Sequence, residues 1–263
     1  VENILESGFY PIDGLLQDLT LCKRVFETLA QFHAFSITRV NDQQMRDLFS
    51  INEGVQYHLG FDDKFNLMIY KKFIKYVWPR LSQKMQEHVI NFDLECAIRV
   101  RDSTYSDNVN VFTVIIIGDP NRMNVFFRNG TADKMQTKCK FVDFQMSRHG
   151  SPVIDLVNYL MTSVELELVE EHSDELFQSY LSELEKTLRT SSNHNRYKYN
   201  LQYLLSDLKK YQHYFMYRLI FLMGQFKTNF AAPSSEEDAY DHLFRSEEFI
   251  LYFKRWMGVL SRW

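Results

Sequence analysis

The sequence has little cysteine, and its three cysteines do not form a recognisable pair. Cys22, Cys96 and Cys139 lie far apart, and no C-x-x-C spacing occurs in the 263 residues. An odd number of cysteines without that spacing argues against both a disulfide framework and a structural zinc site. We therefore expect a protein of a reducing compartment, with the cytoplasm as its location.

The sequence also lacks an excess of positive charge and long apolar runs. The formal net charge is −4 at pH 7, with Lys and Arg spread along the chain, so we expect neither nucleic acid nor a membrane surface as a partner. The apolar run at 216–223 contains Arg218 and is far shorter than the ~20 residues of a membrane helix. With 45% hydrophobic residues, the chain can instead fill a substantial globular core.

Apolar residues recur at helical spacing in both the first and the last third of the chain. The predicted helices cover residues 19–34, 42–49, 67–90, 154–166, 173–188, 199–226 and 246–260. Pro79 should kink or divide the third of them, because proline lacks the amide hydrogen of a helix interior.

Strand candidates are few and lie together in the middle of the sequence. The β-branched and apolar run at 111–117 predicts a short buried strand followed by a functional loop. Residues 124–128 and 139–144 flank an Asn-Gly turn signal, so they predict a hairpin with a loop of several residues. The predicted fold class is α+β and mainly α, with a small antiparallel β insertion.

The chemically informative segment follows the first predicted strand. In IIIGDPNRMN, Asp119 comes directly after that strand and Asn124 five residues later, which is the D-x-x-x-x-N spacing of a kinase catalytic loop. Phosphoryl transfer needs a carboxylate that orients the attacking hydroxyl and accepts its proton, and an amide oxygen nearby that helps to hold Mg²⁺. We predict that Asp119 is the catalytic base and Asn124 a metal ligand.

A second carboxylate strengthens this pattern. KFVDFQ places Asp143 at the end of the predicted hairpin, where protein kinases have the metal-binding Asp of D-F-G, and Gln145 stands in place of the Gly. An isolated D-x-x-x-x-N is common by chance, whereas the order of strand, loop, hairpin and D-F is a much stronger signal. The alternative is a coincidental set of loop acids on a mixed domain.

Three segments resemble one known family. VDFQMSRHGSPVIDLVNYLMTS is similar to the signature of the ecdysteroid kinase-like family, also called CHK kinase-like, which is related to choline and aminoglycoside kinases. ETLAQFHAFS at 27–36 resembles the family's helix that ends in Leu-Ala-x-Phe-His-Ala, and the opening VENILESGF resembles the hinge segment after its N-terminal lobe. Together these segments span most of the chain.

The resemblance implies a protein-kinase-like C-terminal lobe that uses ATP and Mg²⁺ to phosphorylate a hydroxyl of a small molecule, such as an ecdysteroid-like or choline-like alcohol. It gives Asp119 the role of catalytic base and makes Asn124 and Asp143 the metal ligands. It also places Glu2 and Asn3, in the hinge-like segment, at cofactor-binding positions.

The sequence departs from the family and from complete kinases in several places. Ile117 stands where the family has His, and the usual Trp after the catalytic Asp is missing, because Pro120 and Asn121 follow it. None of the nine glycines forms a G-x-G pair, and no strand with Ala-x-Lys precedes the first helix. We therefore expect residues 1–263 to be a C-terminal lobe alone, inactive or nearly so by itself, because positioning and electrostatics supply nearly all of this catalysis.

Other polar and aromatic residues are assigned structural roles. Asp155 should cap a helix or brace the catalytic loop, and His33 should pack or hydrogen-bond within the lobe, because no second His or Cys stands at ligand spacing. A substrate pocket is expected between the acidic edge and the C-terminal helices. The aromatic residues there are more often core at such spacing; they are Tyr211, Tyr214, Phe215 and Tyr217.

Two rival interpretations remain open. The first is a pseudokinase, a binding module that keeps the kinase-like fold without turnover, and Ile117 favours it. The second is a helical interaction protein whose loop acids are only surface residues.

Overall fold

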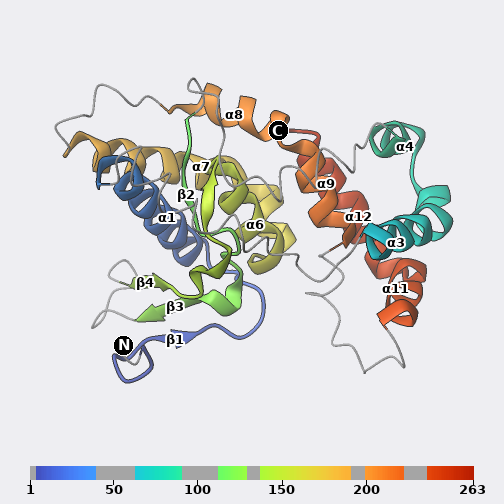
Figure 1. Ribbon diagram of the computed structural model, residues 1–263, viewed down its shortest axis with the longest axis horizontal. Helices are drawn as coiled ribbons and strands as arrows, with labels where there is room; N and C mark the ends of the chain where they lie inside the picture. The colour runs from blue at the N-terminus through green and yellow to red at the C-terminus, as the bar shows by residue number, and fades with distance from the viewer. Residues whose placement is uncertain (1–3, 40–62, 91–111, 129–136, 191–198, 222–235) are drawn as a thin grey trace. The chain divides into compact units, whose positions relative to one another are not determined.

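The computed structural model describes residues 4–39, 63–90, 112–128, 137–190, 199–221 and 236–263. The chain forms two compact units (Figure 1): unit 1 comprises residues 1–56 and 103–208, and unit 2 comprises residues 57–102 and 209–263. Among the described residues, no helix combines the length and the apolar character that crossing a membrane requires.

Unit 1 is built on two long helices and one central helix. α1 (Leu19–Arg39) lies along α7 (Leu166–Arg189), and its start is capped by the Asp18 carboxylate, which accepts hydrogen bonds from the amides of the first turn. α6 (Val153–Ser163) is buried over its whole length. The polar side chains of a helix that is buried on every side must form hydrogen bonds with other groups inside the protein. We therefore expect the polar residues of α6 to brace neighbouring segments.

Two small antiparallel sheets complete unit 1. One has the strand order β1-β3-β4, from β1 (Tyr10–Pro11), β3 (Val125–Arg128) and β4 (Lys138–Phe141). The other pairs β2 (Val114–Ile116) with β5 (Arg148–Gly150). The predicted hairpin is confirmed, because Val125 lies opposite Phe141 in the β3–β4 ladder.

Unit 2 is helical and has an aromatic core. It contains α3 (Asp63–Tyr76), the 3₁₀ turn η1 (Trp78–Arg80), α4 (Gln83–Ile90), α9 (Gln212–Phe221), α11 (Glu236–Arg245) and α12 (Glu247–Leu260). Phe73 packs edge-on against Phe244 at 5.7 Å between ring centroids and tilted against Phe253 at 4.9 Å. Each such pair contributes about 0.5–1.5 kcal/mol beyond the area that it buries.

The predicted fold class is confirmed as mainly helical with small antiparallel sheets, and the differences are local. Pro79 lies in η1, which divides the predicted helix at 67–90 as expected. The predicted stretch at 199–226 is two helices over its described part, α8 (Leu201–Lys210) and α9, with Tyr211 between them. No proline or glycine marks this junction, so the apolar pattern could not locate it.

Three elements, β1, β5 and α11, were not predicted from the sequence. The helix predicted at 42–49 lies outside the described residues.

The aromatic residues expected at a substrate pocket belong to the core. Tyr211, Tyr214, Phe215 and Tyr217 are all buried, with at most 9% of each exposed. This burial confirms the structural interpretation of these four side chains.

Candidate active site

The loop after β2 holds Asp119 by local hydrogen bonds. Asn121 caps the short 3₁₀ turn η2 (Arg122–Asn124): its Oδ1 accepts from the Met123 amide at 2.8 Å, and its Nδ2 donates to Asp119 Oδ2 at 2.9 Å. One side chain therefore both starts the turn and orients the Asp119 carboxylate. Sequence reasoning registered Asn121 only as a departure from the family, although Asp-Pro-Asn is a typical turn signal.

Asn124 connects the loop to the hairpin. Its Nδ2 donates to the Asp119 carbonyl at 3.0 Å, and its own carbonyl accepts from the Val142 amide at 2.9 Å. Since the amide nitrogen is directed at a carbonyl, the side-chain oxygen Oδ1 is the atom that can face a cation. Asp143 follows Val142 directly, so the structure brings the three predicted residues Asp119, Asn124 and Asp143 into one contiguous hydrogen-bonded region.

Asp143 has an unusual backbone conformation. Its φ of 60° and ψ of 70° are left-handed, and among the described residues it is the one non-glycine residue with positive φ. This conformation costs about 1–2 kcal/mol for a residue with a side chain, and such strain persists mainly at functional sites. The side chain is exposed, and Gln145 donates to its Oδ2 at 3.2 Å. The predicted strand at 139–144 ends early for this reason: β4 stops at Phe141.

The loop after β2 is braced from α6 by the Asp155 carboxylate. Oδ2 accepts from the Ile117 amide at 2.7 Å and Oδ1 from the Gly118 amide at 2.9 Å, and the Asp155 side chain is fully buried. Asn158, one turn later on the same face of α6, donates to the Gly118 carbonyl at 3.2 Å. The bracing role predicted for Asp155 is confirmed. Asn158 was missed, although the D-x-x-N spacing on one helix could have indicated it.

His33 extends this brace to α1 and α7. Its Nε2 lies 3.2 Å from Asp155 Oδ2 and its Nδ1 lies 2.9 Å from the Tyr180 hydroxyl, and the ring is fully buried. Burial first, and then the Asp155 and Asp207 carboxylates, raise the pKa of Tyr180 well above its ordinary value. The protonated Tyr180 hydroxyl can thus donate to Nδ1, while Nε2–H donates to Asp155. The predicted hydrogen-bonding role of His33 is confirmed.

Gly118 occupies a position that no other residue fits. Its φ is +86°, and a Cβ built there would come 2.1 Å from the Met146 carbonyl oxygen. Met146 belongs to η4 (Phe144–Met146), which follows Asp143, so Gly118 permits close approach of the two segments that carry the candidate site.

We expect Gly118→Ala to destabilise unit 1 by at least about 2 kcal/mol, because a left-handed residue with a side chain costs about 1–2 kcal/mol and displacing a packed backbone adds to this. Urea denaturation followed by circular dichroism measures the loss. The control is Gly14→Ala, since Gly14 also has positive φ but a Cβ there meets no atom within 4 Å. Equal losses for the two variants would contradict the close-approach argument.

The remaining predicted residues are placed as follows. Glu2 and Asn3 lie outside the described residues. The Ile117 side chain is fully buried, so the position where the family has His packs in the core here. Within the described ranges, no three His, Cys, Asp or Glu side chains form a group that could hold a metal ion without other ligands.

Comparison with known protein families gives a match over most of the chain. Residues 1–192 match the ecdysteroid kinase-like family, and this range contains Asp119, Asn124, Asp143 and the bracing residues. No curated protein matches the chain.

Proposed function

Because the chain belongs to the ecdysteroid kinase-like family, we propose that it carries the phosphoryl-transfer site of a kinase that uses ATP and Mg²⁺ to phosphorylate a hydroxyl of a small molecule. Membership of the family indicates kinase-like phosphotransferase activity. The observation that supports the finer proposal is the pair of hydrogen bonds of Asn124, to the Asp119 carbonyl and from the Val142 amide. These bonds keep the three oxygen-bearing side chains of the D-x-x-x-x-N and D-F motifs in one region.

In this proposal Asp119 acts on the acceptor. Its carboxylate accepts a hydrogen bond from the attacking hydroxyl, orients it and takes its proton as the hydroxyl oxygen bonds to the γ-phosphorus of ATP. The bond from that phosphorus to the bridging oxygen breaks, and ADP leaves. The hydrogen bond from Asn121 Nδ2 to Asp119 Oδ2 limits rotation of the carboxylate. Pre-orientation of this kind is where a kinase gains most of its rate, since the protein itself does little covalent chemistry.

Asn124 and Asp143 would hold the magnesium ion. Amide and carboxylate oxygens are the ligands that Mg²⁺ prefers, and one or two protein ligands are enough when phosphates and water complete the shell. The donor set here fits: Asp143 is exposed, and Asn124 has its Oδ1 available opposite a fixed amide nitrogen. When bound, the ion would neutralise charge on the phosphates.

We further propose that residues 1–263 form a kinase-like C-terminal lobe, that Glu2 and Asn3 contact the nucleotide, and that the acceptor is an ecdysteroid-like or choline-like alcohol. The cysteine usage supports a cytoplasmic location.

Thermal unfolding with and without Mg-ATP tests the proposal. At a nucleotide concentration of 100 times the dissociation constant, binding should stabilise the chain by about 2.7 kcal/mol. Asp143→Asn should remove most of this stabilisation, because the substitution replaces a metal-binding carboxylate by a neutral amide. Asp174→Asn, at an exposed position of α7, is the matched control and should behave like the unaltered chain.

Two results would count against this assignment. Stabilisation by ATP that needs no Mg²⁺ would remove the metal role. Stabilisation that is equal in Asp143→Asn and in Asp174→Asn would leave the loop acids as surface residues of a helical interaction protein.

A second candidate function is a pseudokinase that binds nucleotide without turnover. The fully buried Ile117, at the position of the family's loop His, favours it. This candidate predicts Mg-ATP stabilisation together with no detectable transfer to any alcohol. A stabilisation assay and a transfer assay on one preparation that also contains a nucleotide-binding lobe separate the two.

A further inference from the structure

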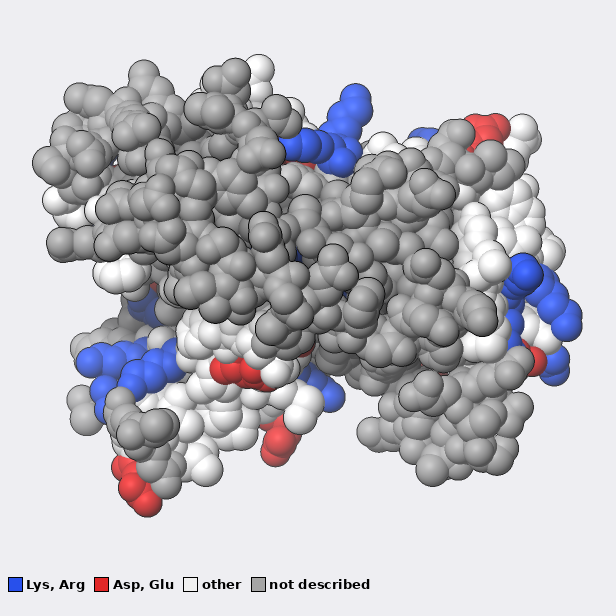
Figure 2. Space-filling view, in the orientation of Figure 1, with Lys and Arg blue, Asp and Glu red and all other residues white. Residues whose placement is uncertain are grey.

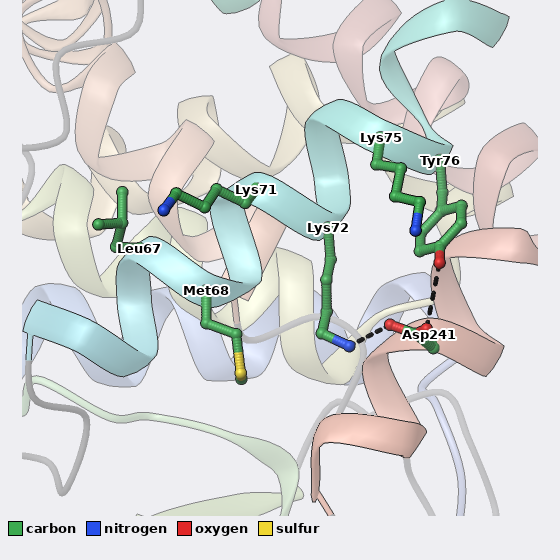
Figure 3. A pocket seen from close by; sticks show the side chains of 7 residues that line it. All are labelled: Leu67, Met68, Lys71, Lys72, Lys75, Tyr76 and Asp241. Carbon is green, nitrogen blue, oxygen red and sulfur yellow. Dashed lines mark hydrogen bonds and ion pairs between the residues drawn. The ribbon is translucent and has the colours of Figure 1, made fainter.

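A second candidate binding site lies in unit 2, remote in sequence from the motifs of the candidate active site. α3 and α11 line a pocket of about 610 Å³ (Figure 3), a size typical of sites for small organic ligands. The side chains that decide its chemistry are Leu67, Met68, Lys71, Lys72 and Lys75 from α3 and Asp241 from α11. Three of these are cationic and one is anionic.

The single carboxylate is already engaged. Asp241 forms an ion pair with Lys72, accepts a hydrogen bond from the Tyr76 hydroxyl at 3.2 Å and lies 3.7 Å from the Arg245 guanidinium. Figure 3 shows Lys72 and Tyr76 directed at Asp241, whereas Lys71 points away from it. Among the described residues, neither Lys71 nor Lys75 has a carboxylate partner.

The surroundings of the pocket are positively charged. Lys75 lies over the Tyr76 ring, 4.8 Å from its centroid, and Arg245 donates to the Tyr76 hydroxyl at 2.8 Å. Hydrogen bonds from Arg245 and Lys75 lower the pKa of Tyr76, as expected beside cations. In Figure 2, basic side chains gather at the right-hand edge of the view, in the part that α3 and α11 occupy in Figure 1.

Helix geometry places Lys71 one turn before Lys75, which lies over the Tyr76 ring. Lys71 and Lys75 are four residues apart on α3, so they share a face and their like charges repel each other. Their four-carbon stems are flexible enough for both ammonium groups to reach one anion, which would turn this repulsion into attraction. Leu67, one turn before Lys71, is 46% exposed, and Met68 lines the pocket beside it.

We propose that this pocket binds a small phosphate monoester whose phosphate is attached to an apolar body. The phosphate carries a charge of about −1.5 to −2 at pH 7, which matches two ammonium groups better than a carboxylate does. Its dianion meets Lys71 and Lys75, and its apolar body covers Leu67 and Met68. A nucleic acid is a poorer match, because its binding uses several cations along a track, whereas these cations line one concave pocket. The proposal does not depend on the proposed kinase function.

Calorimetric titration of the 263-residue chain with hexyl phosphate tests this site. Hexyl phosphate should bind at least ten-fold more tightly than inorganic phosphate, hexanol or hexanoate. The double variant Lys71→Gln/Lys75→Gln should weaken hexyl phosphate binding at least ten-fold. Leu67→Ser should weaken hexyl phosphate binding but leave the weak binding of inorganic phosphate unchanged.

Two controls separate this pocket from other anion sites. Lys84→Gln, at an exposed position of α4, should leave hexyl phosphate binding unchanged. Asp143→Asn should also leave it unchanged, because that substitution alters only the candidate active site. The proposal is overturned if the double variant binds as the unaltered chain does, if Lys84→Gln weakens binding equally, or if inorganic phosphate or hexanoate binds as tightly as hexyl phosphate.

Discussion

Replacing Asp155 with alanine should lower the free energy of unfolding of unit 1 by about 3–5 kcal/mol. The substitution leaves the buried amides of Ile117 and Gly118 without their acceptor, and it removes the hydrogen-bond partner of His33 Nε2. Each buried donor that loses its partner costs about 1–3 kcal/mol. Urea denaturation followed by far-ultraviolet circular dichroism measures the loss.

Two further variants make this result specific. Asp174→Ala removes an exposed acid from α7 and should change stability by no more than about 0.5 kcal/mol. Asp155→Asn keeps one acceptor oxygen but turns an NH₂ group toward a donor, so its loss should lie between those of the two alanine variants. A loss below about 1 kcal/mol for Asp155→Ala would show that the brace is not needed for the fold.

The second large effect concerns the rate of phosphoryl transfer. On the proposed function, in a protein that also carries a nucleotide-binding lobe, Asp119→Asn should lower kcat by about 10²–10⁴-fold, because an amide cannot accept the proton of the attacking hydroxyl. The Asp119 side chain is half-buried and bound by Asn121 Nδ2, so the fold should tolerate the near-isosteric change. ADP release in the presence of an alcohol that the active chain phosphorylates measures the rate.

Paired variants separate the proton acceptor from the metal ligand. Asp119→Asn should keep the stabilisation by Mg-ATP, whereas Asp143→Asn should lose it. A normal kcat in Asp119→Asn would exclude this residue as the base. Loss of Mg-ATP stabilisation in Asp119→Asn would instead place Asp119 among the metal ligands.

Local chemistry explains why much of the site could be predicted. A buried β-branched strand and a hairpin are set by neighbouring residues, and the D-x-x-x-x-N and D-F motifs follow them, so Asp119, Asn124 and Asp143 could be selected from the sequence. The structure places these residues in one region, as that spacing predicts. The end of the second hairpin strand was misplaced, because the left-handed backbone of Asp143 has no signature in residue type.

Contacts between residues far apart in the sequence could not be predicted, because they leave no local pattern. The pocket of unit 2 is lined by α3 and α11, whose contacting residues Lys72 and Asp241 are 169 positions apart, and α11 itself was not predicted. The junction of α8 and α9 near Tyr211 carries no helix-breaking residue. A periodic sequence pattern extends over only a few helical turns, so it cannot locate contacts between distant segments.

The sequence by itself determined the helical character of the chain, the hairpin and the three candidate phosphoryl-transfer residues, because these depend on periodicity and turn chemistry within a few positions. Only the tertiary structure decided what holds the loop. The hydrogen bonds of Asp155 to the Ile117 amide and to His33 join residues 38 and 122 positions apart, and that of His33 to Tyr180 joins residues 147 apart. Partners so distant are chosen by the packing of α1, α6 and α7, which no local pattern specifies.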